Sequence, residues 1–210
     1  MRWDIINKLI EKNNYKSYLE IGYYKGWSFD NVNCERKMAV DPNPSKTPQQ
    51  EEMNIGEFDG EVLKQYSDEY FARLLPQIKF DIIFIDGLHE VEQVFRDIEN
   101  ALYHLNEGGT IVLHDCNPPK YEHTTTGIDG CWTGDTYKAI LKFQHNNYFG
   151  VYNYYTLDID WGCGIITKNQ ITIENMKDLN YIKATEDWDY FDEHRVELLN
   201  LKNYEEWRRN

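Results

Sequence analysis

The chain has 210 residues, of which 41% are hydrophobic and 28% charged, and its formal net charge is -14. A chain of this size and composition is expected to form one domain around one hydrophobic core. The acidic balance argues against binding to a nucleic-acid backbone or an anionic membrane surface, because both require clustered Lys and Arg. A small neutral or cationic ligand is compatible with this charge.

The sequence also predicts the cellular compartment. No apolar run approaches the roughly 20 residues of a membrane span, and residues 1–4 do not open a hydrophobic signal-peptide core. The four cysteines show no Cys-x-x-Cys spacing, which favours reduced thiols over disulfides or zinc ligands. We therefore expect a cytoplasmic protein.

In the first half of the chain, hydrophobic spacing predicts helices alternating with strands. This alternation is typical of an α/β protein with a parallel sheet and right-handed crossovers. The expected elements are a helix at 3–12, a strand at 17–21, a helix at 26–34, a strand at 37–40, a polar loop at 43–60, short helices and a weak strand within 61–75, a strand at 80–85, a helix at 91–105 ended by the glycines of 107–109, and a strand at 110–113.

The second half begins with a predicted loop at 115–133 and a helix at 135–143. Two strands follow at 148–155 and 162–167, close enough to form an antiparallel pair at the sheet edge. We expect one domain over 1–168 and an acidic, aromatic extension over 169–210, helical near 192–201. This extension would cover the sheet or pair with a second subunit in a homodimer.

The turn after the first strand carries Glu20, Gly22 and Gly26. A dinucleotide fingerprint needs a further glycine, where the backbone approaches a pyrophosphate, but Tyr23 and Tyr24 stand there. A bulky turn of this kind favours a cofactor without a pyrophosphate, such as S-adenosylmethionine. The alternative is an ordinary strand-to-helix turn.

Two further polar sites are candidates for cofactor binding: Asp41 after the second strand, and the Ser67–Asp68 pair before an apolar turn. Asp41 lies twenty-one positions after Glu20 at the end of the second strand, where a carboxylate accepts ribose hydroxyls. The alternative is a turn-capping aspartate before proline. Ser67 and Asp68 could contact the adenine edge, or simply start a helix.

A third group combines acids and histidines. Asp86 and Asp115 each follow a buried strand, so neighbouring strands would bring both carboxylates to one hard cation, Mg²⁺ or Mn²⁺. His89 follows Asp86 by three residues and is a candidate general base. Each residue could instead cap a helix or lie solvated at a strand end.

Taken in order, these motifs resemble the class I S-adenosylmethionine-dependent methyltransferases. The resemblance runs through Leu-Glu-Ile-Gly with Gly-x-Ser, Val-Asp-Pro, Phe-Ile-Asp-Gly-Leu-His and Gly-Gly-Thr-Ile-Val-Leu-His-Asp, from residue 18 to 115 and more loosely to 167. The order of motifs is similar to that of small-molecule O-methyltransferases of the catechol and macrolide-sugar types, and it resembles most closely the bacterial methyltransferases associated with sugar and surface-glycan pathways. It implies a Rossmann-like methyltransferase fold: a mostly parallel seven-stranded sheet with an antiparallel C-terminal edge hairpin and helices on both faces.

The resemblance also implies roles for individual residues. Cofactor binding would fall to Glu20, Gly22, Gly26, Ser28, Asp41, Ser67, Asp68 and Asp86, metal binding to Asp86 and Asp115, and catalysis to Asp86, His89 and His114. Catechol-type members have an asparagine after the second aspartate as a third ligand, whereas this chain has Cys116. Asn117 or His114 would have to substitute, or the reaction would proceed without metal with a histidine as base.

The expected reaction is methyl transfer to a hydroxyl of a small molecule, a sugar or sugar nucleotide in glycan biosynthesis. The loop at 115–133, with Tyr121 and Trp132, would cover this substrate. Three other functions stay open: N-methylation of a small amine, a nicotinamide-dependent oxidoreductase, and an adaptor without turnover. The missing middle glycine argues against the oxidoreductase.

Overall fold

The computed structural model describes residues 1–45, 59–125, 127, 131–146, 151–168 and 179–210. The described residues form two compact units. The first comprises Met1–Leu88 and Arg96–Val112, and the second comprises His89–Phe95 and Leu113–Asn210. None of the described helices is both long and apolar enough to cross a membrane.

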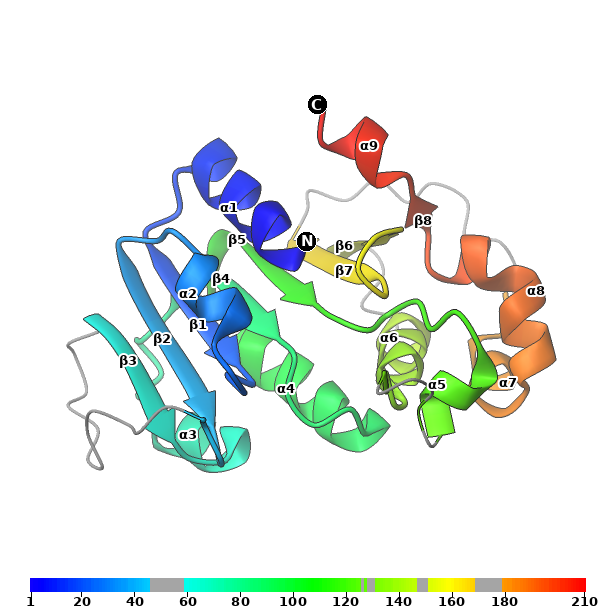
Figure 1. The fold of residues 1–210 in the computed structure, drawn as a ribbon, viewed down its shortest axis with the longest axis horizontal. Helices are drawn as coiled ribbons and strands as arrows, with labels where there is room; N and C mark the ends of the chain where they lie inside the picture. Colours follow the sequence, from blue (N-terminus) through cyan, green and yellow to red (C-terminus); the bar gives the residue numbers. More distant parts are fainter. Residues whose placement is uncertain (46–58, 126, 128–130, 147–150, 169–178) are drawn as a thin grey trace. The chain divides into compact units, whose positions relative to one another are not determined.

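The first unit is built on parallel strands. Strand β1 pairs in parallel with β2 on one side and β4 on the other, and β3 pairs in parallel with β2. The strand order is β3-β2-β1-β4-β5 (Figure 1), which confirms the predicted α/β organisation. Its elements are α1 (Arg2–Asn13), β1 (Ser17–Ile21), α2 (Trp27–Asn31), β2 (Arg36–Asp41), β3 (Asp59–Lys64), α3 (Ser67–Arg73), β4 (Phe80–Ile85), most of α4 (Val91–Tyr103) and nearly all of β5 (Leu105–Leu113).

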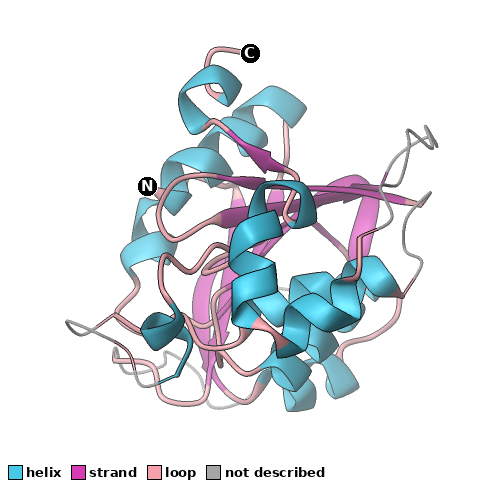
Figure 2. Cartoon of the chain, turned by 90° about the vertical axis from the view of Figure 1, so that its right-hand side faces the viewer, coloured by secondary structure: helices cyan, strands magenta, loops and turns pink. Residues whose placement is uncertain are grey.

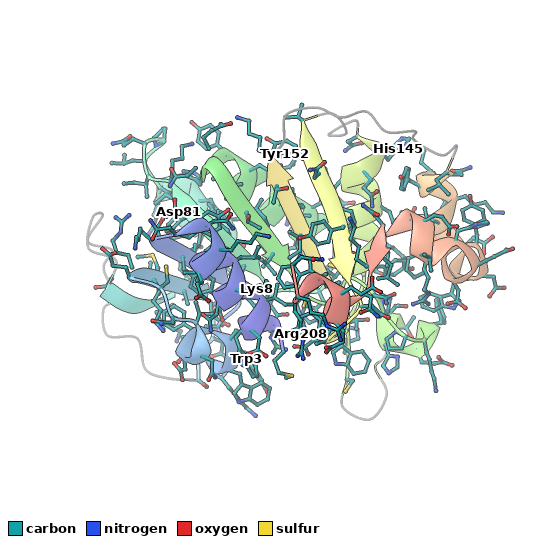
Figure 3. The ribbon with its side chains drawn as sticks, turned by 90° about the horizontal axis from the view of Figure 1, so that it is seen from above. Trp3, Lys8, Asp81, His145, Tyr152 and Arg208 are labelled. Atoms are coloured by element: carbon teal, nitrogen blue, oxygen red, sulfur yellow. The ribbon has the colours of Figure 1, made fainter. Side chains whose placement is uncertain are left out.

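Helix α1 packs through the apolar positions that predicted it, since Ile5, Ile6, Leu9 and Ile10 are all buried. It ends at Asn13, and its C-cap residue Asn14 has a left-handed backbone with a φ of 56°. Just beyond it, Asp81 accepts hydrogen bonds from the backbone N–H groups of Lys16 and Ser17. In Figure 3, α1 runs from Trp3 past Lys8 toward Asp81 at the start of β4.

The second unit contains an antiparallel hairpin of β6 (Tyr152–Leu157) and β7 (Cys163–Lys168), which confirms that prediction. The two-residue strand β8 (Leu201–Lys202) pairs in parallel with the other side of β6, so the order is β7-β6-β8 and the hairpin is not the edge. The helices of this unit, labelled in Figure 1, are α5 (Tyr121–Thr125), α6 (Thr136–His145), α7 (Tyr181–Glu186), α8 (Trp188–Leu198) and α9 (Tyr204–Trp207). Figure 2 distinguishes helices from strands by colour, with helices in cyan and strands in magenta.

Several predicted elements differ from the observed ones. The described residues contain eight strands rather than seven, because Leu201 belongs to β8 and not to a tail helix. The expected helix at 26–34 is only the five residues of α2. Short helix α5 lies within the predicted loop at 115–133. Most of the predicted loop at 43–60, the start of the strand at 148–155 and the start of the extension lie outside the described residues.

The glycines at 107–109 were predicted to end a helix, and this was wrong. Helix α4 ends at Tyr103, and both glycines lie inside β5. A Cβ at Gly109 would lie 2.8 Å from the backbone oxygen of Asp81, so the glycine allows two backbones to approach. Of the two glycines, Gly109 therefore marks a close approach between strands rather than the end of a helix.

Gly22 fixes the junction between β1 and β4. The backbone N–H of Asp86 donates to the Ile21 carbonyl at 2.8 Å, and that of Gly22 donates to Val40 at 2.9 Å. Gly22 has a φ of +95°, and a Cβ there would overlap the backbone carbonyl of Asp86. Only glycine satisfies both the left-handed backbone and this close approach.

We predict that Gly22→Ala destabilises the protein by about 3 to 5 kcal/mol, because it combines left-handed strain with backbone overlap. Gly108→Ala is the matched control, since Gly108 also has a positive φ, of +76°, but no atom lies within 4 Å of its added Cβ. This control should cost about 1 to 2 kcal/mol. Equal losses of unfolding free energy in urea would contradict the assigned role of the close approach.

Candidate active site

Glu20 is a buried acid in the middle of the sheet of the first unit. Its side chain is 1% exposed, and its carboxylate accepts a hydrogen bond from the Tyr18 hydroxyl. Burial raises the pKa of Glu20 from 4.5 to about 8, although the Tyr18 hydrogen bond and the charge of Arg2 act in the opposite direction. A buried carboxyl poised near neutrality is typical of a functional site.

The turn after Glu20 is packed by aromatic side chains. Tyr23 is buried against Phe29, with ring centroids 5.7 Å apart, whereas Tyr24 is exposed. Gly26 has a φ of +76°, and a Cβ there would overlap the Tyr23 hydroxyl. Tyr23 thus fills the space beside Gly26, whereas Tyr24 extends into solvent.

Asp41 closes the same turn from the end of β2. One carboxylate oxygen accepts from the backbone N–H of Tyr24 and the other from that of Asn43, both at 2.7 Å. The turn-capping alternative is therefore what the structure shows. A carboxylate has about four acceptor sites, so capping leaves capacity for ribose hydroxyls, and that role stays a prediction.

Ser67 and Asp68 lie in the first turn of α3, where the N-cap position belongs to Tyr66. Asp68 forms an ion pair with Arg96 at 3.4 Å, and both side chains are about half exposed. The helix-start alternative is consistent with this placement, although neither residue is the N-cap. A contact with adenine stays a prediction.

Arg2 is a functional candidate that the sequence did not suggest. Its Nε donates to the Ser28 hydroxyl at 2.9 Å and lies 3.6 Å from a carboxylate oxygen of Asp86. Ser28 is buried in α2, and Asp86 directly follows β4. Arg2 in α1 thus contacts two of the predicted cofactor residues, Ser28 in α2 and Asp86 directly after β4.

In the second unit, His89 is held by a backbone carbonyl and a carboxylate. Its Nδ1 lies 3.0 Å from the Trp132 carbonyl oxygen and 3.4 Å from Asp115, and its ring stacks on Trp132. A carbonyl only accepts, so Nδ1 carries the hydrogen and Nε2 has the lone pair in the neutral ring. This tautomer is the one a general base needs at Nε2.

His114 lies between two carboxylates of the same unit. Its Nδ1 is 3.2 Å from Asp115 and its Nε2 is 3.6 Å from Asp160, and all three side chains are buried. Asp115, Asp160 and Trp161 have left-handed backbones, with φ values of 58°, 53° and 64°. Strained positions of this kind cluster where a side chain must be aimed at a site.

Asn117 is a poor substitute for the missing third metal ligand. Its side-chain oxygen accepts from Arg195 of α8 at 2.8 Å, while its side-chain nitrogen donates to Asp158 at 3.2 Å. Arg195 also donates to the carbonyl of Pro118 and so holds the loop after β5. Cys116 is buried, which raises the pKa of its thiol well above the usual range.

The predicted site residues are thus distributed over both units. In the first unit, Arg2 contacts Ser28 and Asp86, Gly22 lies against the Asp86 backbone, and Glu20 is within electrostatic reach of Arg2. In the second unit, Asp115 joins His89 and His114 in one cluster. The Asp86–Asp115 metal pair has one member in each unit and stays a prediction. The sequence analysis did not identify Arg2, Asp160 or Arg195. For Asp160, the one signal was an acid two positions before a glycine in a short connection between two strands.

The chain is similar to a known domain family and to a viral protein. Residues 19–116 match a family model described as a methyltransferase domain. The chain is 28% identical over 156 residues to the uncharacterized protein R132 of Acanthamoeba polyphaga mimivirus, a match covering 68% of this chain. It spans 66% of that relative, which is just under two thirds of its length.

Solved structures of O-methyltransferases share the fold. The enzyme from Bacillus cereus in complex with SAH has a TM-score of 0.54 and 11% identity, with 80% of each chain covered. TomG from Streptomyces achromogenes in complex with SAM has a TM-score of 0.53 and 11% identity, covering 80% of this chain and 79% of that one. These matches confirm the predicted Rossmann-like methyltransferase fold.

The raised pKa of Glu20 predicts a pH-dependent stability. Between 4.5, its ordinary pKa, and about 8, its pKa in the folded state, the folded protein binds more protons than the unfolded chain. The free energy of unfolding therefore falls as pH rises through this window, by up to about 1.4 kcal/mol per pH unit. Glu20→Gln removes this slope, so the variant gains stability relative to wild type as pH rises.

Urea unfolding at several pH values between these limits measures the difference. The exposed Glu11→Gln in α1 is the control for the loss of one acidic group. A Glu20→Gln profile parallel to that of wild type would show that burial does not raise the pKa of Glu20.

Proposed function

We propose that this chain, a class I S-adenosylmethionine-dependent methyltransferase, transfers the methyl group to a hydroxyl oxygen of a small molecule. The acceptor class we propose is a sugar or sugar nucleotide in glycan biosynthesis. A neutral sugar is compatible with a chain of net charge -14, and the anionic phosphates of a sugar nucleotide would have to lie away from the acidic side chains.

The observation that carries the proposal is the orientation of His89. A hydroxyl must lose its proton to become a strong nucleophile, so O-methylation benefits from a general base. Hydrogen bonding of Nδ1 to Trp132, with Asp115 beside it, leaves the lone pair on Nε2. An amine loses its proton far more readily than a sugar hydroxyl does, so it depends less on a general base, and this arrangement favours the hydroxyl over the amine.

In this mechanism, His89 takes the hydroxyl proton at Nε2, and Asp115 stabilises the resulting imidazolium. A bound S-adenosylmethionine would supply an electrophilic methyl group on its sulfonium. Asp86 places negative charge at the turn of the first unit, complementary to a cationic cofactor, and a bound cation would also favour the charged form of Glu20, whose pKa burial raises to about 8. Trp132 stacks on His89 and restricts its rotation.

A divalent metal is the second part of the proposal. Asp86 and Asp115 provide oxygen ligands of the type that Mg²⁺ and Mn²⁺ prefer, and the ion would lower the pKa of the substrate hydroxyl. Both acids already have partners: Arg2 lies beside Asp86, and the imidazoles of His89 and His114 flank Asp115. We therefore assign the metal an assisting role and the base function to His89.

The proposal predicts that His89→Gln lowers kcat for methyl transfer by about 100- to 10,000-fold, because the general base is lost. Binding of S-adenosylhomocysteine should stay unchanged. His145→Gln, an exposed histidine of α6, is the matched control and should retain normal activity. The assay follows labelled methyl transfer to a panel of sugars and sugar nucleotides.

A fully active His89→Gln protein would contradict the assignment of the base. A methylated amine instead of an ether in the product would contradict O-methylation. Activity in EDTA, with and without added Mg²⁺, tests the metal separately. Equal rates would show that methyl transfer does not need a divalent metal. An Asp86→Ala protein with full activity would remove Asp86 from the active site.

A further inference from the structure

Arg2 places a positive charge among the acids of the first unit. Its side chain is 13% exposed although arginine is usually solvated, and it reaches from the first turn of α1 to Ser28 and Asp86. The charge of Arg2 also lowers the pKa of Glu20, which places the guanidinium within electrostatic reach of that buried acid. In Figure 3 the same end of α1 is marked by Trp3, opposite the end near Asp81.

The positively charged guanidinium of Arg2 lies close to the negatively charged carboxylate of Asp86. Asp86 is an anion 3.6 Å from the guanidinium nitrogen, and the Ser28 hydroxyl lies 2.9 Å from it. An amino-acid group has the complementary pattern, because its ammonium and its carboxylate are separated by a single carbon. Asp86 matches the ammonium of such a group, and Arg2 with the Ser28 hydroxyl matches its carboxylate.

We propose that Arg2 binds the α-carboxylate of the cofactor's amino-acid part. Guanidinium and carboxylate form paired, charge-assisted hydrogen bonds, which are stronger than neutral ones. Such bonds gain further when the site is shielded from water, as the low exposure of Arg2 indicates. This inference rests on the proposed function, since it presupposes a cofactor with an amino-acid part.

A second explanation is that Arg2 only fastens α1 to α2 and β4. Substitution would then weaken the fold, and every ligand would bind less well to the same degree. A role in carboxylate binding predicts a loss confined to ligands that carry the carboxylate. Two ligands that differ only in this group therefore separate the explanations.

The experiment measures binding of S-adenosylhomocysteine and of its decarboxylated analogue, which keeps the ammonium, by titration calorimetry. We expect Arg2→Ala to weaken S-adenosylhomocysteine binding by about 10- to 100-fold, in the range of a charge-assisted hydrogen bond. Binding of the decarboxylated analogue should change by less than about threefold. Arg2→Lys keeps the charge but not the planar fork, so its loss should be intermediate.

Lys12→Ala is the matched control, because it removes an exposed cation from the last turn of α1. It should leave the affinity for both ligands unchanged. If Arg2→Ala unfolds, Arg2→Lys supplies the same comparison between the two ligands. Retained binding of the decarboxylated analogue also shows that a variant is folded.

Equal loss of affinity for both ligands in the Arg2 variants would overturn the inference, and so would normal binding of S-adenosylhomocysteine by Arg2→Ala. Either result leaves the proposed methyltransferase function intact. Failure of the wild-type protein to bind either ligand would instead overturn the proposed function, and the inference with it.

Discussion

The close approach of Gly22 to the backbone of Asp86 is the constraint on which the first unit depends. It allows β1 to end directly beside β4, with the Asp86 N–H bonded to the Ile21 carbonyl. Glu20 and Asp86 therefore belong to the ends of two paired strands, where open α/β sheets bind ligands. The absence of a side chain at one residue determines where the acids lie.

The second unit aims its polar side chains by another means. Left-handed backbones at Asp115 and Asp160 direct carboxylates to the two nitrogens of His114, and Asp115 also reaches His89. Such backbones are costly for residues with a side chain, by roughly 1 to 3 kcal/mol each. Neighbouring hydrogen bonds from Cys116 and Asn117 to the β6–β7 turn hold this conformation in place.

The sequence predicted what depends on local pattern. Buried strands, the turn at Gly22 and the acids at strand ends follow from hydrophobic spacing and from parallel-sheet topology, and they led to Glu20, Asp86 and His89. Contacts between distant segments leave no such pattern: Arg2 reaches Ser28 across 26 positions, and Arg195 reaches Asn117 across 78. The prediction that the glycines of 107–109 end a helix was wrong because glycine is favoured both at helix ends and where two strands approach closely.

The central claim is that S-adenosylmethionine binds at the turn joining β1 to α2, against the end of β4. A crystal structure of the protein with S-adenosylhomocysteine tests it most directly. We predict the amino-acid part of the ligand beside Gly22 and Asp86, with its ribose near Asp41. Density for the ligand at any other place, with an unchanged turn at Gly22, would contradict the account.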